Sequence, residues 1–228
     1  MKRYAIGDIH GGYFTFHALI NQICPKHDDR VYLLGDYIDR GADSCGVLEL
    51  IIRMQEAGCA IYPVRGNHDD MLLRNITGQH DNYSAYWIKG WGPETLKSFG
   101  IAAVEEMPYR YLNFLQSLPY VRLEHDYVFV HAALDMRKNN PITESDPTGM
   151  MWEKIGDIDP QRLGNRKLVT GHKIRTMPSI IASLQTNHFE LDNGAYSDLD
   201  SSIGSLVALN LDTMELTAQR WLDGEAWG

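Results

Sequence analysis

The sequence predicts an α/β protein that forms one domain, residues 1–228, with two β-sheets. Short apolar runs alternate with amphipathic runs over the first 70 residues, in the order strand, helix, strand, helix, strand. Clusters of polar residues follow directly after the strands. The C-terminal third consists of short runs separated by turn signals, which is typical of strands, and several of these are expected to be antiparallel.

The N-terminal part predicts three parallel strands joined by helices. We expect the strands at 3–6, 31–34 and 60–64, and the helices at 13–23 and 45–58. The strands are apolar throughout, as expected for parallel strands covered on both faces. Ligands bind to such sheets at the carboxyl ends of the strands, and the polar clusters lie there.

The rest of the chain predicts a helical segment followed by more strands. Residues 69–118 have mainly helical patterns, and strands are expected at 127–134 and 167–173, each with a histidine near its end. A long polar connection, 135–165, contains a short helix around Met150–Ile155. Four C-terminal runs are predicted to be strands: SIIASL, HFELD, SLVALNL and MELTAQR.

Charge and cysteine content narrow the class of protein. The net charge of −9 argues against a general nucleic-acid binder, although a bound metal can reverse the local field around an anionic substrate. The three cysteines lack a C-x-x-C spacing, which indicates unpaired thiols in a reducing compartment. The N-terminus has no apolar segment typical of a signal peptide, and no apolar run approaches the roughly 18 residues that span a bilayer. We therefore expect a cytoplasmic protein that does not bind membranes.

Five predicted strand ends carry polar side chains that can bind metals or phosphate. They are Asp8 and His10; Asp36, Asp39 and Arg40; Arg65, Asn67, His68 and Asp69; His131; and His172. If the strands lie side by side, these groups meet at one edge. Carboxylate and amide oxygens with imidazole nitrogens suit Mn²⁺, Fe or Zn²⁺, and suit Ca²⁺ poorly. Two metals that share a bridging carboxylate would use all of the candidate ligands, and such a pair suits in-line displacement at phosphorus.

The motifs GDIHGG, GDYIDRG and RGNHD, followed by VHAA and GHK, resemble the signature blocks of the calcineurin-like metallophosphoesterases. The Asp-Arg pair in GDYIDRG resembles the phosphoprotein phosphatase branch in its small bacterial and phage form. The match is dense over the first 70 residues and continues at single positions to about residue 172. The resemblance implies a two-sheet sandwich (α/β/β/α) with the active site at the carboxyl ends of the strands.

The resemblance also implies a role for each matching residue. Asp8, His10 and Asp36 would hold one metal, and Asp36, Asn67, His131 and His172 the other. A water that bridges the metals would be the nucleophile. His68 would be the general acid, oriented by Asp39. Arg40 and Arg65 would bind the phosphate oxygens.

The resemblance implies a metal-dependent phosphomonoesterase, specifically a serine/threonine protein phosphatase that acts on phosphoproteins or phosphopeptides and on small phosphoesters in vitro. We expect two divalent ions, with Mn²⁺ favoured and Fe, Zn²⁺, Ni²⁺ or Mg²⁺ also compatible. The alternative is a symmetrical dinucleoside-tetraphosphate hydrolase, a related class that usually lacks the Asp-Arg pair. A third alternative, a non-catalytic phosphate-binding module, is disfavoured because every expected ligand and His68 are present.

The sequence departs from the protein phosphatases at two places. Asp69 stands where that branch has Glu, and we expect it to support the ligands or to start a helix rather than to bind metal. The branch also has a further phosphate-binding arginine near a tryptophan, where this chain reads MMWEKI; Arg137 or Arg175 are the candidates to replace it.

Two further segments leave alternatives open. Tyr83, Tyr86, Trp87 and Trp91 fit either helix packing, which we favour, or a substrate groove. The run DNG at 192–194 predicts either a hairpin turn or a loop at the rim of the pocket.

Overall fold

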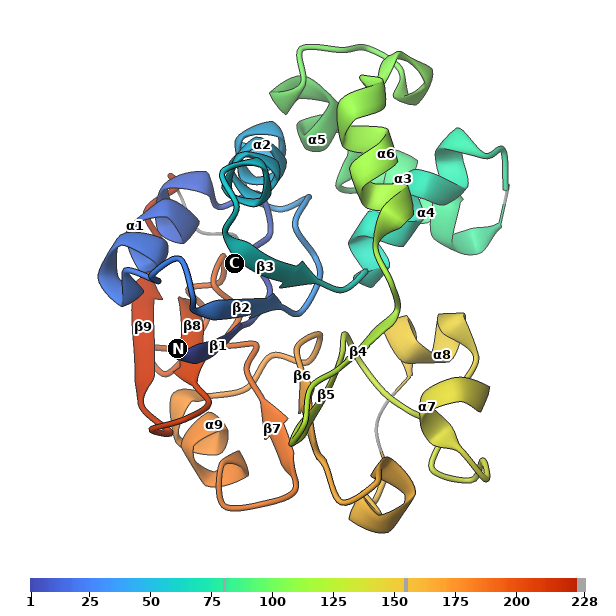
Figure 1. The fold of residues 1–228 in the computed structure, drawn as a ribbon. Helices are drawn as coiled ribbons and strands as arrows, with labels where there is room; N and C mark the ends of the chain where they lie inside the picture. Colours follow the sequence, from blue (N-terminus) through green and yellow to red (C-terminus); the bar gives the residue numbers. More distant parts are fainter. Residues whose placement is uncertain (80, 154–155, 225–228) are drawn as a thin grey trace.

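The computed structural model describes residues 1–79, 81–153 and 156–224. Two sheets pack face to face, and helices cover their outer faces (Figure 1). The predicted α/β/β/α sandwich is therefore confirmed.

The first sheet has the strand order β3-β2-β1-β8-β9. Its strands are β1 (Arg3–Ile6), β2 (Arg30–Leu33), β3 (Ala60–Pro63), β8 (Ser205–Asn210) and β9 (Leu216–Arg220). The first three strands are parallel, with Tyr4 opposite Val31 and Val31 opposite Ile61. β8 runs antiparallel to both β1 and β9. The N-terminal strand–helix repeat thus forms half of the sandwich, and the C-terminal hairpin completes this sheet.

The second sheet has the order β4-β5-β6-β7. Its strands are β4 (Val121–Leu123), β5 (Tyr127–Val130), β6 (Lys167–Thr170) and β7 (His188–Glu190). The last three strands are parallel, and β4 pairs antiparallel with β5. The metal-binding candidates therefore come from two sheets, and not from the single edge that side-by-side strands would give.

Apolar side chains fill three layers, because successive residues of a strand point to opposite faces of its sheet. Ala5 of β1 and Phe129 of β5 belong to the cluster between the sheets. Their neighbours point outward: Ile6 joins the cluster beneath the first helices, and Val128 joins the cluster on the outer face of the second sheet. Both faces of the central strands are thus buried, whereas the edge strands β4 and β9 are partly exposed.

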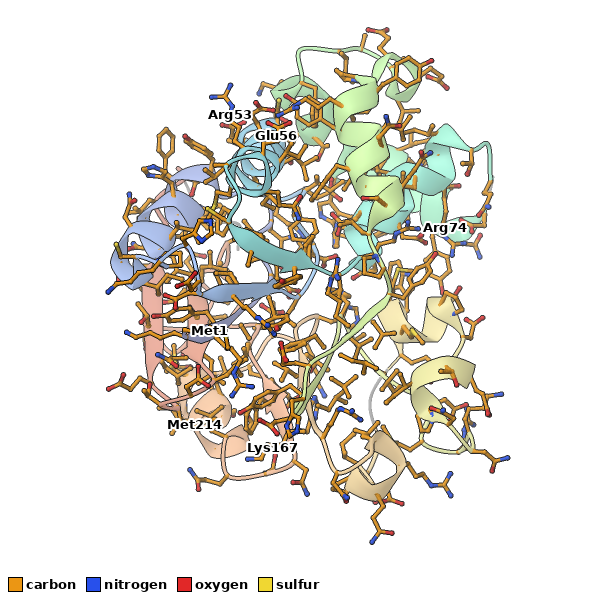
Figure 2. The ribbon with its side chains drawn as sticks, in the orientation of Figure 1. Met1, Arg53, Glu56, Arg74, Lys167 and Met214 are labelled. Carbon is orange, nitrogen blue, oxygen red and sulfur yellow. The ribbon has the colours of Figure 1, made fainter. Side chains whose placement is uncertain are left out.

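The helices lie on the outer faces and in a separate group beyond β3 (Figure 1). Their bounds are α1 (Tyr13–Ile23), α2 (Ser44–Glu56), α3 (Asn67–Ile76), α4 (Asn82–Lys89), α5 (Gly92–Ser98), α6 (Tyr109–Ser117), α7 (Pro141–Glu144), α8 (Pro147–Trp152) and α9 (Met177–Ser183), with short 3-10 turns at Val104–Glu106 and Pro160–Leu163. Arg74, labelled in Figure 2, joins α3 to the start of α4 through Asp70 and Asp81.

Two predicted elements differ from the structure, and one strand of the structure was not predicted. The run SIIASL is a helix, α9, because the Thr176 side chain accepts a hydrogen bond from the Ser179 amide and Pro178 occupies the first turn. The prediction of a strand there was wrong. The helix expected around Met150 ends at Trp152, and Ile155 lies outside the described residues. The short strand β4 was not predicted.

Within the described residues, none of the helices has the length and apolar character needed to cross a membrane.

Candidate active site

Loops after strands of both sheets bring the predicted metal ligands together. Asp8 and Asp36 follow β1 and β2, and Asn67 begins α3 just beyond β3. His131 and His172 follow β5 and β6 of the second sheet. The carboxyl ends of these strands meet where the two sheets adjoin, so one small region receives ligands from both.

Asp36 lies at the centre of this region. Its Oδ2 atom is 3.6 Å from Nε2 of His10 and 3.5 Å from Nε2 of His131. These separations are too long for hydrogen bonds but suit ligands that share a cation, since each metal–ligand bond is about 2.0–2.2 Å. The arrangement is that of a carboxylate placed between two histidines.

Both histidines are oriented through their second ring nitrogen. Nδ1 of His10 lies 3.2 Å from the Ile38 carbonyl oxygen, and Nδ1 of His131 lies 2.7 Å from that of Leu34. This contact places the proton on Nδ1 and leaves Nε2 free to bind a metal. Burial lowers the pKa of both imidazoles, that of His10 to about 3, so the rings are neutral as metal binding requires.

Asn67, His172 and Asp8 complete the cluster. Oδ1 of Asn67 is 2.8 Å from His131 Nε2 and 3.1 Å from His172 Nδ1. Oδ2 of Asp8 accepts a hydrogen bond from the His172 amide, whereas Oδ1 is buried and has no hydrogen-bond partner among the described residues. A buried carboxylate oxygen without a donor fits a position beside a cation.

Ligand atoms of two groups lie close enough to hold metal ions. Those of His10, Asp36 and His68 are all within 4.8 Å of one another, as are those of Asp8, Asp36 and His131. Oxygen and imidazole donors suit a divalent transition ion. The residues therefore fit one or two such ions, with Asp36 common to both groups.

The backbone of these loops is strained at the site. Among the described residues, eight other than glycine have positive φ, and five of these are predicted site residues: His10, Asp36, Asp39, Arg40 and His172. Such conformations cost on the order of 1–3 kcal/mol each and concentrate at functional sites. Two glycines give the loops the room they need, because a Cβ at Gly66 would overlap Asp36 Oδ1, and one at Gly171 would overlap Asp8 Oδ1.

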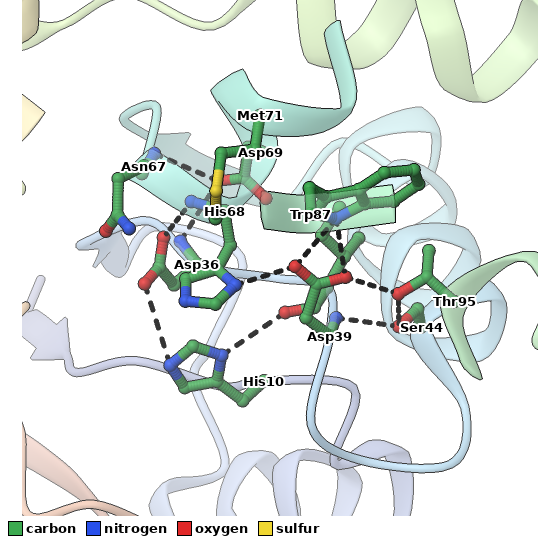
Figure 3. Close-up of polar contacts among 12 residues, drawn as sticks. His10, Asp36, Asp39, Ser44, Asn67, His68, Asp69, Met71, Trp87 and Thr95 are labelled. Carbon is green, nitrogen blue, oxygen red and sulfur yellow. Dashed lines mark hydrogen bonds and ion pairs between the residues drawn. The ribbon is translucent and has the colours of Figure 1, made fainter. Parts of the chain in front are cut away.

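His68 lies between two carboxylates beside the ligands (Figure 3). Its amide donates to Asp36 Oδ1 at 3.0 Å, and its Nδ1 is 2.6 Å from Asp39 Oδ2. Burial lowers the pKa of His68, but the charge of Asp36 and the hydrogen bond with Asp39 raise it by more, so the net shift is upward. These contacts therefore favour the protonated form of the His68 ring.

Asp39 is fixed by two further donors to its carboxylate and by one acceptor of its backbone amide. Trp87 Nε1 donates to it at 2.9 Å and Thr95 Oγ1 at 2.5 Å, while the Asp39 amide is 3.0 Å from Ser44 Oγ (Figure 3). Trp87 is buried, as the predicted helix packing requires, and its indole also serves this network.

Arg40 lies between two aromatic rings. Its guanidinium carbon is 4.2 Å from the ring centre of Trp91 and 4.8 Å from that of Tyr196. The same rings pack against the site histidines, Trp91 against His68 at 4.6 Å and Tyr196 against His10 at 4.9 Å. Trp91 therefore reaches the site itself, and cation–π contacts hold Arg40 next to it.

The model of the calcineurin-like phosphoesterase family matches residues 1–196. The chain belongs to the calcineurin-like phosphoesterases. Members of this family are metal-dependent hydrolases of phosphoesters, which agrees with the cluster of histidines and carboxylates.

Relatives and solved structures differ in their named activities. A protein of Nitrosomonas europaea named as a symmetrical bis(5'-nucleosyl)-tetraphosphatase is 34% identical over 135 residues, which cover 59% of this chain and 45% of that protein. The chain thus matches about half the length of this curated relative. A solved structure described as a candidate diadenosine tetraphosphatase superposes with a TM-score of 0.64 at 20% identity, covering 98% of this chain and 95% of that one. A serine/threonine phosphatase from Saccharomyces cerevisiae superposes with a TM-score of 0.63 at 15% identity, covering 98% and 81%. At these identities the two structures establish the fold alone.

Arg65 is a predicted phosphate-binding residue, but its side chain contacts α6 and neighbouring residues instead of the metal ligands. Its guanidinium donates to the carbonyl oxygens of Leu115 and Gln116 and to the Tyr120 hydroxyl, and it pairs with Asp70 at 3.4 Å. None of these partners is a predicted metal ligand. The contacts favour a role in joining the catalytic loop to the end of α6 over a role in phosphate binding.

Asp69 supports the ligand loops, as expected for this departure from the protein phosphatases. Its carboxylate accepts hydrogen bonds from the amides of Asp36, Tyr37 and Gly66. It therefore ties the second motif to the third. Burial and the nearby charge of Asp36 raise its pKa to about 7.

Asp192 is a buried carboxylate in the DNG segment, for which the sequence predicts either a hairpin turn or a loop at the rim of the pocket. The DNG segment forms a loop between β7 and β8, in which Asp192 Oδ1 accepts a hydrogen bond from the Gly194 amide at 2.7 Å. Burial raises the pKa of Asp192 to about 7, and its charge in turn raises that of Asp8. Of the two arginines considered as replacements, Arg137 pairs with Asp135 at the surface and Arg175 pairs with Glu190 beside His172.

Proposed function

We propose that this calcineurin-like phosphoesterase is a two-metal hydrolase that cleaves the phosphoanhydride of dinucleoside tetraphosphates. The observation that carries the hydrolytic part is the position of Asp36 Oδ2, 3.5–3.6 Å from Nε2 of both His10 and His131. The substrate rests on the curated relatives, which are named as symmetrical bis(5'-nucleosyl)-tetraphosphatases. Symmetrical cleavage adds one water and yields two nucleoside diphosphates.

Six residues would hold the metals. By the family resemblance, Asp8, His10 and Asp36 would bind one ion, with Asp36 shared by a second ion on Asn67, His131 and His172. Divalent ions there would acidify a water for attack on phosphorus and neutralise charge on the phosphoryl oxygens. Mn²⁺ is the ion we favour for this mixed oxygen and nitrogen set.

His68 would donate a proton to the leaving oxygen. Its Nδ1 faces Asp39, so Nε2 is the atom free to carry the transferred proton. Asp39 holds the ring in this orientation and stabilises its charged form. Arg40, held between Trp91 and Tyr196, would bind non-bridging oxygens of the phosphoryl group.

A phosphoprotein is the second candidate substrate. The feature that favours it is the Asp39–Arg40 pair in GDYIDRG, which resembles the protein phosphatase branch. In the structure Asp39 contacts His68, and Arg40 lies against the same tryptophan as His68. The pair thus serves proton transfer and phosphate binding for either substrate, which makes a direct comparison of rates necessary.

The test is a comparison of kcat/KM for diadenosine tetraphosphate and for a phosphothreonine peptide, with the protein first chelated and then supplied with Mn²⁺. We expect the nucleotide to be preferred by at least ~10-fold and both activities to require metal. Preference for the peptide would replace the proposed substrate with the second candidate. No turnover of either substrate, or of p-nitrophenyl phosphate, with any divalent ion would refute the hydrolase.

A further inference from the structure

A cavity of about 160 Å³ opens beside the metal-ligand cluster. It lies at the carboxyl ends of β6 and β7, and its wall includes His172, whose Nδ1 is 3.1 Å from Asn67 Oδ1. A cavity of ~150 Å³ accommodates a benzene ring. The space is therefore of the size of an aromatic ring, and His172 belongs both to its wall and to the predicted metal ligands.

One wall of the cavity is aromatic. Trp152, the last residue of α8, is half-buried and lines the cavity. Its ring packs against Tyr83 at 4.4 Å and meets His172 edge-on at 6.3 Å. These contacts fix the indole, so it offers a rigid flat surface on which another ring can stack.

The remaining walls carry paired polar groups. Arg175 Nε donates to Glu190 Oε1 at 2.8 Å, and Thr170 Oγ1 is 2.7 Å from His188 Nε2. Among the described residues, Glu190 Oε2 has no hydrogen-bond partner, so this carboxylate oxygen can accept from an amino group as acidic side chains do when they bind a nucleobase. Lys173, next to His172, adds a positive charge to the cavity wall.

We propose that this cavity binds the base of one nucleoside of the substrate, with the ring stacked on Trp152 and its polar edge facing Glu190 and Arg175. The inference rests on the proposed function and adds to it the part of the molecule that selects a nucleotide. The phosphate chain would run from the cavity past Lys173 and His172 to the metal ligands. A serine or threonine phosphate offers no ring to fill the space.

The test uses two ligands that differ only by the nucleoside. Binding of adenosine 5'-methylenediphosphonate and of methylenediphosphonate, neither of which is hydrolysed at the bridging carbon, is measured by calorimetry on the Mn²⁺-loaded protein. Trp152→Ala should weaken the nucleoside ligand roughly 5- to 150-fold, the range of base–aromatic stacking, and leave methylenediphosphonate unchanged within about twofold. Trp152→Phe should retain most of the affinity.

Control variants separate the cavity from folding and from the metals. Tyr109→Ala removes an exposed aromatic side chain of α6 that does not line the cavity. It should leave the affinity for both ligands unchanged. Glu190→Gln keeps the shape of the side chain and should weaken binding of the nucleoside ligand alone. If Trp152→Ala does not fold, this second variant tests the inference. Metal content should equal that of the wild type in every variant.

Three results would overturn the inference: equal binding of the two ligands by the wild type, no loss in the cavity variants, or an equal loss for both ligands. Failure of the proposed function gives a different result. In that case the wild type does not hydrolyse diadenosine tetraphosphate, whereas the loss specific to the nucleoside ligand persists and supports the cavity as a nucleotide site.

Discussion

His68 is the residue on which the proposed proton transfer depends. It is buried, its backbone amide donates to Asp36, and its ring contacts Asp39, which Trp87 and Thr95 also hold. A single side chain thus connects the metal-ligand cluster to a fixed carboxylate. The ring cannot rotate away without breaking a 2.6 Å contact with Asp39.

Replacing His68 with Asn should lower kcat by roughly 10²–10⁴-fold, because general acid catalysis contributes about that much. The six predicted ligands remain, so metal content should stay at the wild-type level. Turnover measured together with elemental analysis checks both parts. Unchanged turnover would refute the role of His68 as the acid, and loss of metal would show that its role is structural.

Gly171→Ala replaces none of the predicted ligands, but it should weaken metal binding because the added Cβ overlaps Asp8 Oδ1. We expect a loss of roughly 10–100-fold in Mn²⁺ affinity, comparable to that of other changes next to metal ligands. Calorimetric titration of the chelated protein measures it. Gly156→Ala is the matched control, since a Cβ there meets nothing within 4 Å among the described residues. Equal affinities in the two variants would contradict the packing argument.

At the residue level the sequence predicted most of the cluster. The motifs at the ends of the first three strands contain Asp8, His10, Asp36 and Asn67. Because parallel strands end at the same edge of a sheet, their positions in the sequence already imply that these side chains lie close together. For Asp192 the DNG run leaves a hairpin turn and a rim loop open, and Tyr196 stands in no motif, because the loop after β7 comes near the cluster only when the second sheet packs on the first. For Arg65, the motif gives no information about the carbonyl groups of α6 that its guanidinium reaches.

At the level of elements, the loop that carries His10 is braced by the C-terminal segment. Gly12, the residue before α1, supplies no side-chain cap, and Asp223 takes that role by accepting hydrogen bonds from the amides of Phe14 and Thr15. The Trp221 ring packs on Gly12, where a Cβ would overlap it. Residues more than 200 positions apart thus support the first of the motifs predicted to bind metal.

Asp223→Ala should lower the free energy of unfolding by about 1 kcal/mol, as for other lost helix caps. Urea denaturation measures the change. Glu105→Ala, at an exposed acidic residue of a 3-10 turn, is the control and should have an effect below about 0.5 kcal/mol. Equal stability of the two variants would show that the cap does not stabilise α1.

Elements were predictable where their own pattern decides their structure. The strands β1 to β3 and the helices α1 and α2 have clear periodicity, and the structure places them within one or two residues of the prediction. The helix α9 was mistaken for a strand because two of its apolar residues, Ile180 and Ile181, are β-branched, whereas Thr176 and Pro178 fix its start. β4 is a three-residue edge strand, and it depends on pairing with β5.

The whole molecule concentrates negative charge where its two sheets meet. Asp8, Asp36, Asp69 and Asp192 are all buried there, in a chain of net charge −9. Burial together with the charge of Asp192 and Asp36 raises the pKa of Asp8 well above its usual range. Divalent cations would relieve this repulsion, so metal binding and stability should be coupled.

Chelation should lower the melting temperature by about 5–10 °C, the effect of losing a ligand present at 100 times its Kd in a chain of this size. The difference should grow between pH 6 and pH 8. Asp69 and Asp192 have folded-state pKa values raised to about 7, so the stability that their protonated forms contribute to the metal-free protein is lost as pH rises through 7. Thermal unfolding with a chelator and with Mn²⁺ at both pH values checks this. A melting temperature that is the same with and without metal would contradict it.

The most direct test of the two-metal site is a Mn²⁺ titration of the chelated protein, with turnover of its best phosphate substrate followed at each step. The arrangement of Asp36 between His10 and His131 predicts no turnover without metal, saturation at two ions per chain, and loss of turnover in Asp36→Asn. Full turnover of the chelated protein, or saturation at a single ion, would contradict the two-metal site.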